Sequence, residues 1–441
     1  MAVCFRFLLR FCVSFIFIGS VYAAEAIQEI QRDHALGKIV SSIAIVGLQR
    51  TQAGVVRREL LIKEGKPLRL SELEESLQRL KNLRLFHSVA DSYYLDKMNQ
   101  VHVRLGLSES FTTIPIVKIN SGGDTRYLVA GVYDINTLGE YLETGIQYES
   151  WNGEGGGVVW FRNPRLMNKR VRFGADLWSV KRPRDLYEPD GTSQGDFITF
   201  QRKLNIFVDK EWLNGFTLGM GVELDQTQLL DGTMSGQLSM GISQAIANQS
   251  EFITHWAKVY LTLGRLDYDN VLLQGRLSEL SMNYTSPDLG SDYEAYRVTW
   301  DNKYFWRVGK NANLAWRLKW AKTNSQRIQD LFYIGGFENV RGYFDGQLRG
   351  KQFWQSNIEF RDILFSSSWY YLQGNIFADI AQLIKPTSVI ESSSNDVFYS
   401  SGIGLRLGSP KIYRFLARLD IALNTSHPAT SRVSFAVQQF F

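Results

Sequence analysis

Cysteine is almost absent from this 441-residue chain, which contains only Cys4 and Cys12. Both lie in an N-terminal stretch that we expect to be removed, so the mature chain would hold no cysteine. That absence excludes disulfide bonds and the metal and redox sites that cysteine builds. The histidines show no metal-ligand spacing, and we therefore expect neither a metal site nor a cofactor. The five are His34, His87, His102, His255 and His427.

Long apolar runs are also missing once the first 23 residues are set aside. Residues 1–23 place Arg6 and Arg10 ahead of a short apolar core, and a small-residue cleavage site ends at Ala23. This pattern predicts a secretory signal peptide. The alternative is a membrane anchor, although the apolar core is short for a bilayer span. Removing the segment lowers the net charge from +5 to +3, which gives no support for a nucleic-acid partner.

A mixed pattern of helices and strands covers residues 38–110. Leu73, Leu77 and Leu80 fall on one face of its clearest helical segment. The pattern therefore predicts a small α+β domain. Its expected elements are a strand, two helices and two strands, over residues 38–49, 51–62, 69–83, 86–95 and 100–109.

Two local features mark the borders within and before this domain. Ser71 stands three residues ahead of Glu74, which is the spacing of a capping box and predicts the start of the second helix. Residues 24–37, between the signal segment and the first strand, are expected to form a linker. The order of elements after this linker resembles that of a POTRA domain. The resemblance implies that the domain binds extended chains by adding a strand to its sheet edge.

From about residue 111 the helical period disappears, and apolar residues alternate with polar ones. In the segment 313–324, Leu314 and Trp316 fall on one face. Arg317 and Lys319 fall on the opposite face. Such alternation is typical of a strand with one apolar and one polar side. About sixteen segments of this kind follow one another with no helix between them.

This succession predicts a transmembrane antiparallel β-barrel over residues 111–441, with an apolar outside and a polar interior. In lipid every backbone polar group has to be paired, so the sheet must close. A soluble sandwich also alternates, but the aromatic clusters near segment ends, as in residues 366–373, favour a barrel. Residues 231–251 are expected to be a loop. We place the strand starts at Thr112, Arg126, Tyr141, Gly155, Arg170, Ile198, Phe216, Phe252, Leu272, Asp292, Ala312, Gln352, Trp369, Val397, Arg414 and Arg432.

One glycine-rich stretch, IGGFENVRGYFDGQLRG at 334–350, interrupts the alternation between the eleventh and twelfth strands. Its centre is Val340-Arg341-Gly342-Tyr343. Glycine at the third position would allow a positive φ beside the arginine. An ordinary surface turn is the alternative interpretation of the four residues taken alone.

With this motif, the chain resembles the BamA/TamA superfamily, whose members carry POTRA domains ahead of a sixteen-stranded outer-membrane barrel. The resemblance implies that the loop folds back into the barrel and that Arg341 meets Glu359 and Asp379 on the two following strands. Phe377 and Ala381 occupy the first and last places of the family's F-x-D-x-G pattern, with alanine in place of glycine. The planar guanidinium can bond a carboxylate through two N–H groups, which suits such a lock.

Two further residues point to the junction between the first and last strands. Pro115 cannot donate to a ladder, so it belongs at a seam or at the strand's periplasmic start. The chain ends in an alternating strand on Phe441, which resembles the terminal signal of bacterial outer-membrane barrels. Gln439 departs from the apolar residue usual at its position. Members of the superfamily are thought to open at this seam.

These features predict an outer-membrane insertase or translocase with its N-terminal domain in the periplasm. Its partners would be outer-membrane lipid, unfolded client polypeptides and periplasmic accessory proteins. The alternative is a passive pore with a periplasmic adaptor domain. Enzymatic activity is not expected, because the G-x-S-x-G spacing at residues 191–195 lacks the following helix of a nucleophile elbow.

Overall fold

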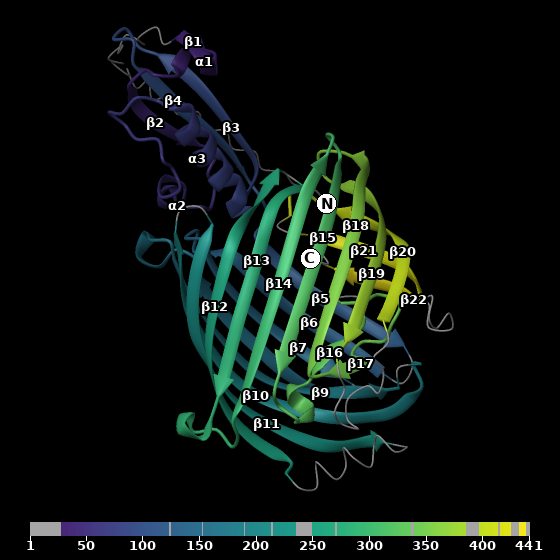
Figure 1. Ribbon diagram of the computed structural model, residues 1–441. Coiled ribbons are helices and arrows are strands. Elements are labelled where there is room, and N and C mark those ends of the chain that lie inside the picture. The colour runs from purple at the N-terminus through teal and green to yellow at the C-terminus, as the bar shows by residue number, and fades with distance from the viewer. Residues whose placement is uncertain are drawn as a thin grey trace, which may run out of the picture.

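The computed structural model describes two connected parts, a small N-terminal domain and a large barrel (Figure 1). The expected signal peptide with Ala23, and Phe441 with Gln439, lie outside the described residues. The structure describes residues 28–437, except 123–124, 152, 189, 213–214, 235–248, 270, 337–338, 385–396, 413–414 and 425–431.

The N-terminal domain is a four-stranded sheet covered by helices, in the strand order β1-β3-β4-β2. Strands β2 and β4 are parallel, and the other neighbours are antiparallel. Leu73, Leu77 and Leu80 of the longest helix are all buried against the sheet, as their spacing predicts. The elements are β1 (Gln28–Ile30), α1 (Arg32–Ala35), β2 (Val40–Val46), α2 (Ala53–Arg57), α3 (Leu70–Leu83), β3 (Phe86–Leu95) and β4 (Val101–Glu109).

The predicted linker and the predicted capping box both differ from the structure. Part of the range 24–37 is structured, because β1 pairs with β3 and Ala35 of α1 is buried in the domain core. Helix α3 begins at Leu70 with Arg69 as its N-cap, and no side chain caps it. Ser71 therefore lies inside the first turn, where its spacing to Glu74 has no capping role.

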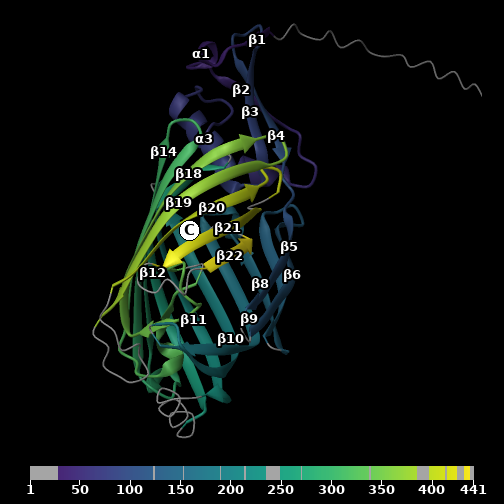
Figure 2. The ribbon, with the colours of Figure 1, turned by 90° about the vertical axis from the view of Figure 1, so that its right-hand side faces the viewer.

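The barrel is one antiparallel sheet of sixteen strands in chain order, which confirms the predicted count (Figures 1 and 2). We call the end where β5 begins, beside the N-terminal domain, the near end, and the opposite end the far end. The strands are β5 (Thr113–Gly122), β6 (Thr125–Thr137), β7 (Leu142–Trp151), β8 (Glu154–Asn163), β9 (Val171–Tyr187), β10 (Ser193–Trp212), β11 (Phe216–Met234), β12 (Glu251–Asp269), β13 (Leu272–Thr285), β14 (Ala295–Val308), β15 (Ala312–Thr323), β18 (Gln352–Ser366), β19 (Tyr371–Leu383), β20 (Val397–Gly408), β21 (Leu416–Asn424) and β22 (Arg432–Val437).

The longest strands extend further at the far end than the sequence predicts. Strand β10 begins at Ser193 rather than Ile198, and β11 continues to Met234, inside the expected loop 231–251. The two strands pair out to Gly195, opposite Met234, with a register shift at their tips. Backbone pairing between neighbours extends these strands where their side-chain pattern no longer signals a strand. Three short 3-10 helices and one small hairpin lie in the connections: η1 (Leu166–Asn168), η2 (Pro287–Leu289), η3 (Ile328–Asp330), β16 (Phe332–Ile334) and β17 (Leu348–Gly350).

The two faces of the barrel strands have the predicted polarity. In β21, Leu419, Ile421 and Leu423 are 41%, 43% and 55% exposed on the outside. Arg418 and Asp420, which alternate with them, are buried in the interior. An apolar outer surface of this extent is what a barrel needs to lie in lipid.

Exposed aromatic side chains gather at the near end of the barrel. Trp369 and Tyr370 lie between β18 and β19, and Trp212 and Phe216 flank the connection between β10 and β11. This matches the girdle expected where a barrel meets a membrane interface. Among the described residues, no helix has the length and apolar character needed to cross a membrane.

Strands β5 and β22 are the two ends of the sheet and lie side by side, and we call their junction the seam (Figure 2). No ladder joins the described residues of these two strands. At the near end the backbone N–H of Phe111 donates to the carbonyl of Lys411 at 2.8 Å. Pro115 is the third residue of β5, opposite Val132 of β6, so it lies both beside the seam and at the start of its strand.

The N-terminal domain contacts the near end of the barrel through the region around α2. The side-chain amide of Asn136, in β6, donates to Thr51 Oγ1 at 2.9 Å. Glu59, which is 2% exposed, forms an ion pair with Arg165 in the connection after β8, with Nε and Oε1 2.7 Å apart. Ile135 of the barrel is buried within the domain's apolar core. The contact therefore combines apolar burial with a shielded charge pair.

A second contact joins α3 to β12 on another part of the barrel wall. Arg265 bonds the carboxylate of Glu75 through two nitrogens, at 2.8 and 3.2 Å. The amide of Asn82 donates to Asp267 at 2.9 Å, and its oxygen accepts the backbone N–H of Tyr268 at 3.1 Å. With two separated contacts, the domain is held in one orientation at the mouth of the barrel.

We predict that Glu59→Gln loosens this docking, because it removes the carboxylate charge that Arg165 faces in a shielded position. A charge-assisted hydrogen bond of this kind contributes roughly 1.5–3 kcal/mol. Limited proteolysis of the folded chain should then cut faster in residues 110–112, between the domain and the barrel. Glu72→Gln is the matched control, since Glu72 faces Arg69 at 3.7 Å on the exposed surface. Equal cleavage of both variants would contradict the prediction.

Glu109, at the end of β4, ties the segment before α2 to the sheet. Its Oε1 accepts the backbone N–H groups of Gln49 at 3.0 Å and Thr51 at 2.9 Å, and its Oε2 accepts that of Arg50 at 3.1 Å. Partial burial acts to raise the pKa of Glu109, but these hydrogen bonds outweigh burial and hold the pKa below its usual value of 4.5. The ionised carboxylate therefore stabilises this part of the domain.

A pH titration checks the sign of this effect. Because the pKa is lowered by folding, the contribution of Glu109 is present above its unfolded pKa and is lost as pH falls through the folded value. Carbon-13 NMR of the Glu109 carboxyl group in the folded chain should give a pKa below 4.5. The amide of Thr51 should lose its downfield shift over the same pH range. A carboxyl pKa at or above the usual value would refute the assignment.

Candidate functional site: a buried arginine in the inserted loop

The glycine-rich stretch enters the barrel as a loop on a short hairpin. Strands β16 and β17 pair over three residues, and the loop of residues 335–347 runs between them. Gly342 adopts a φ of +84°, as its place beside the arginine predicts. A Cβ built on it would lie 3.4 Å from Ser400 and 3.5 Å from Ala422, on the walls formed by β20 and β21. The loop therefore packs against the inside of the barrel, not on its surface.

Arg341 is the centre of this contact and is fully buried. Its Nε and Nη2 donate to the two carboxylate oxygens of Asp379, each at 2.8 Å. Its Nη1 donates to Oε1 of Glu359 at 2.5 Å. Its backbone N–H also donates to Asp379, at 3.1 Å. One guanidinium therefore joins β18 and β19, and the same bonds fix the depth of the loop.

The register of β18 and β19 explains how two acids reach one arginine. Asn357 lies opposite Asp379, and Glu359 lies opposite Phe377. The acids are thus diagonal neighbours on the inner face, and the Phe377 ring lies between them and beneath the guanidinium. The Arg341 Cζ is 3.4 Å from the centroid of that ring, which adds a cation–π contact.

Apolar packing surrounds the ionic contact. Val340 and Tyr343, on either side of the Arg-Gly pair, are buried in one cluster with Ala381 of β19 and Phe398 of β20. The rings of Tyr343 and Phe398 meet edge to face at 5.8 Å. Ala381, which stands where the family pattern has glycine, is 1% exposed and packs in this cluster. The structure brings together all the residues that the sequence predicted for this site: Val340, Arg341, Gly342, Tyr343, Glu359, Asp379, Phe377 and Ala381. Pro115 lies elsewhere, on β5.

The sequence prediction missed several charged partners. Arg406 of β20 donates to Oε2 of Glu359 at 2.5 Å, and Arg361 of β18 approaches the same oxygen at 2.6 Å. Asp420 of β21 lies 3.8 Å from Arg341. Each of these residues alternates with outward-facing neighbours on its strand, and this position in the alternation was the one feature of the sequence that could have placed it inside the barrel. Parity places a side chain inside the barrel, but it does not tell which interior charges share one site.

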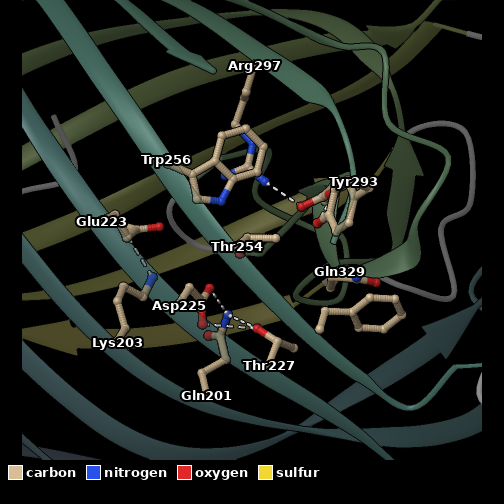
Figure 3. A pocket seen from close by; sticks show the side chains of 12 residues that line it. Gln201, Lys203, Glu223, Asp225, Thr227, Thr254, Trp256, Tyr293, Arg297 and Gln329 are labelled. Atoms are coloured by element: carbon tan, nitrogen blue, oxygen red, sulfur yellow. Dashed lines mark hydrogen bonds and ion pairs between the residues drawn. The ribbon is translucent and has the colours of Figure 1, made fainter. Parts of the chain in front are cut away.

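A separate hollow lies against β10, β11 and β12, and several of its residues interact with one another (Figure 3). Lys203 and Glu223 face each other at 3.8 Å. Asp225 accepts a hydrogen bond from Thr227 at 3.1 Å, and Arg297 lies 5.0 Å from the ring of Trp256. The cavity measures about 60 Å³ and has little free space beyond a few water molecules. It shares no residue with the Arg341 site.

Fold and site together define a class of protein. It is a sixteen-stranded transmembrane-type barrel with a small α+β domain at one end and a loop fixed in its interior by a buried arginine. A family model described as the Omp85 superfamily domain matches residues 137–441. A second model, POTRA, described as the surface antigen variable number repeat, matches residues 38–109. The chain belongs to the Omp85 superfamily and carries a POTRA domain, which confirms the resemblance stated from the sequence.

Relatives of known name support this membership. The outer membrane protein assembly factor BamA of Nitratidesulfovibrio vulgaris is 22% identical over 311 residues, or 69% of this chain, but the match covers 37% of that relative's length. A crystal structure of BamA from Haemophilus ducreyi lacking POTRA domains 1–3 superposes with a TM-score of 0.54 at 15% identity, covering 91% of this chain and 84% of that one. CdiB from Escherichia coli gives 0.58 at 12% identity, covering 91% and 75%. At these identities the two structures show a shared fold.

We predict that Arg341 and Asp379 are strongly coupled. Arg341→Ala leaves the buried carboxylate of Asp379 without its cation, whereas Glu359 keeps Arg406 and Arg361. A broken buried pair costs roughly 3–5 kcal/mol. Asp379→Asn should cost a similar amount, and the double variant much less than the sum. The measurement is a double-mutant cycle on the urea unfolding of the barrel in detergent. Additive costs would show that the two residues do not act as a pair.

Proposed function

We propose that the protein is an outer-membrane insertase or translocase that assembles client polypeptides in the bacterial outer membrane, or exports them across it, through a gated barrel. The near end, with the POTRA domain, faces the periplasm, and the far end faces the outside. The proposal is supported by membership of the Omp85 superfamily and by relatives named as an assembly factor and as CdiB. The apolar outer face supplies the contact with outer-membrane lipid.

The observation that carries the proposal is the seam. Fifteen junctions of the sheet are ladders, whereas no ladder joins the described residues of β5 and β22. An unpaired strand edge offers N–H and C=O groups to another extended chain. A client strand would pair with β5 here, and Pro115 would weaken closure at the near end because it lacks an N–H group.

The inserted loop would hold the barrel in a defined state while the seam works. Arg341 joins the loop to β18 and β19, three strands or more from β22, so the loop keeps that wall rigid. The POTRA domain would bring clients to the seam. Its short edge strands β1 and β2 provide places where an extended chain can add to the sheet. Periplasmic accessory proteins would bind the same domain.

A passive pore is the second candidate, and the interior of the barrel argues against it. Diffusion needs an open interior, whereas here a loop of residues 335–347 occupies part of it and is fixed by a buried ionic site. Catalysis is not part of the proposal. The segment Gly191–Gly195 with the elbow-like spacing leads into β10 and not into a helix.

The experiment compares outer-membrane and secreted proteins after depletion of the protein and after Arg341→Ala replacement in the cell. We expect both changes to lower the level of at least one client at least several-fold, measured by quantitative mass spectrometry of outer membranes and culture medium. Unchanged levels of every protein in both cases would refute the proposal. A loss of small-solute uptake without a change in protein levels would establish the passive pore.

Arg182→Ala is the matched control for that experiment. Arg182 forms an interior ion pair with Glu149, with Nη2 and Oε2 2.6 Å apart, on strands β9 and β7. The variant removes a guanidinium from the interior at a site separate from the Arg341 contacts. Client levels should follow the wild type in this strain, provided that the barrel is present in equal amount.

A further inference from the structure

At the tip of the inserted loop, the residue after the motif contacts one strand on each side of the seam, β9 and β22. Phe344 follows Tyr343 directly and is half-buried. Its backbone N–H donates to Oε1 of Gln347 at 2.8 Å, and Gln347 itself is fully buried. The ring of Phe344 is therefore presented from a fixed backbone. Neither the motif nor the Arg341 site accounts for its position.

The ring of Phe344 stacks on the barrel wall at β9, the fifth strand from the seam on the β5 side. Its ring centroid lies 4.3 Å from that of Tyr187, with the planes 19° apart. Tyr187 is the last residue of β9, at the far end of the barrel. Arg349 of β17 donates to the carbonyl of Tyr187 at 2.9 Å, so the base of the loop holds the same residue. The stack thus has support on both of its members.

The second contact of Phe344 is with the last strand. The Arg432 Cζ lies 3.5 Å from the centroid of the Phe344 ring. Arg432 is the first residue of β22, and its pairing with Ala422 is the outermost of the β21–β22 ladder. Phe344 therefore lies between β9 and the far end of the strand that borders the seam.

Among the described residues, the Phe344 ring is the main partner of the Arg432 guanidinium. Within the described residues, no carboxylate lies within 4.0 Å of its guanidinium, and its Nε is buried without a hydrogen-bond partner. A half-buried guanidinium without an acid is stabilised by an aromatic face. If Arg432 moves away from Phe344, it loses that stabilisation. The far end of β22 is thus favoured in its present place.

We propose that Phe344 is a positioning residue that ties the far end of β22 to β9 and so restrains opening of the seam. The inference rests on the proposed function, in which the seam admits a client strand. Strand β22 has a ladder with β21, while no ladder with β5 is described, so a side-chain contact at its far end matters for its place. Since the loop is anchored at Arg341, movement of β22 and release of the loop tip are coupled.

The test measures the distance across the seam by double electron–electron resonance on the full chain in lipid nanodiscs. Spin labels go on Val117 of β5 and Val433 of β22, which are 55% and 68% exposed on the outer face. The native cysteines, Cys4 and Cys12, lie within the expected signal peptide and do not interfere in the processed chain. We expect Phe344→Ala to raise the population of long distances roughly 3-fold, the effect of losing one cation–π contact.

Three further variants keep the test decisive if Phe344→Ala folds poorly. Arg432→Gln leaves the loop intact and should raise the long-distance population to a similar extent, whereas Arg432→Lys keeps a cation and should stay near the wild type. Arg327→Gln is the matched control, because Arg327 also lies against an aromatic ring, 4.2 Å from that of Tyr293, but on another part of the barrel. A distance distribution in Phe344→Ala and Arg432→Gln equal to that of Arg327→Gln would overturn the inference.

The same samples separate this inference from the proposed function. If Arg341→Ala widens the seam and lowers client levels while Phe344→Ala does neither, the positioning role is refuted and the insertase or translocase function stands. If Phe344→Ala widens the seam while depletion of the protein changes no client, the positioning role stands and the proposed function fails.

Discussion

The positive charge of Arg341 is the constraint on which the interior of this barrel is built. A guanidinium with no solvent exposure is stable only when its charge and its N–H groups are matched. Two carboxylates on neighbouring strands provide that match, and their positions depend on the register of β18 against β19. A slip of one residue in either strand would turn the acid of that strand to the outside. The loop, the register and the ion pair therefore specify one another.

Among the described residues, the barrel has one part in which side-chain contacts across the interior join the strands, and another, at the seam, in which they do not. Strands β18 to β21 are joined by ladders and by the charges gathered around Glu359. The seam between β5 and β22 has no such network among the described residues. The POTRA domain adds to the fixed part, because it is held at two places on the near end by Glu59 and Glu75. The proposed function requires conformational freedom at the seam, where the described residues form no such network.

Much of the fold follows from local patterns. The alternation of Leu419 and Ile421 with Arg418 and Asp420 is enough to predict both the strand and its two faces. The predictions from sequence are wrong where the local pattern is weak or where tertiary contacts override it. The range 24–37 has no strong period, yet part of it forms a strand because β3 offers an unpaired edge. Ser71 has a capping spacing, but the helix begins at Leu70 because burial of its leucines sets its position.

For the site, the sequence alone determined the chemistry: an arginine beside a glycine, two acids of interior parity on the next strands, and a small residue at Ala381. Those residues are separated by about 20 to 40 positions, and it was the resemblance of the motif to a family pattern that predicted their association. Only the tertiary structure decided which other charges join them. Arg406 and Asp420 reach the site because β20 and β21 are the next strands after β19 and their interior side chains face the same loop. Parity carries no information on which interior side chains the loop contacts. The contact of Phe344 with Tyr187 and Arg432 was also decided by the tertiary structure, since it joins β9 and β22, which are not neighbours in the sheet.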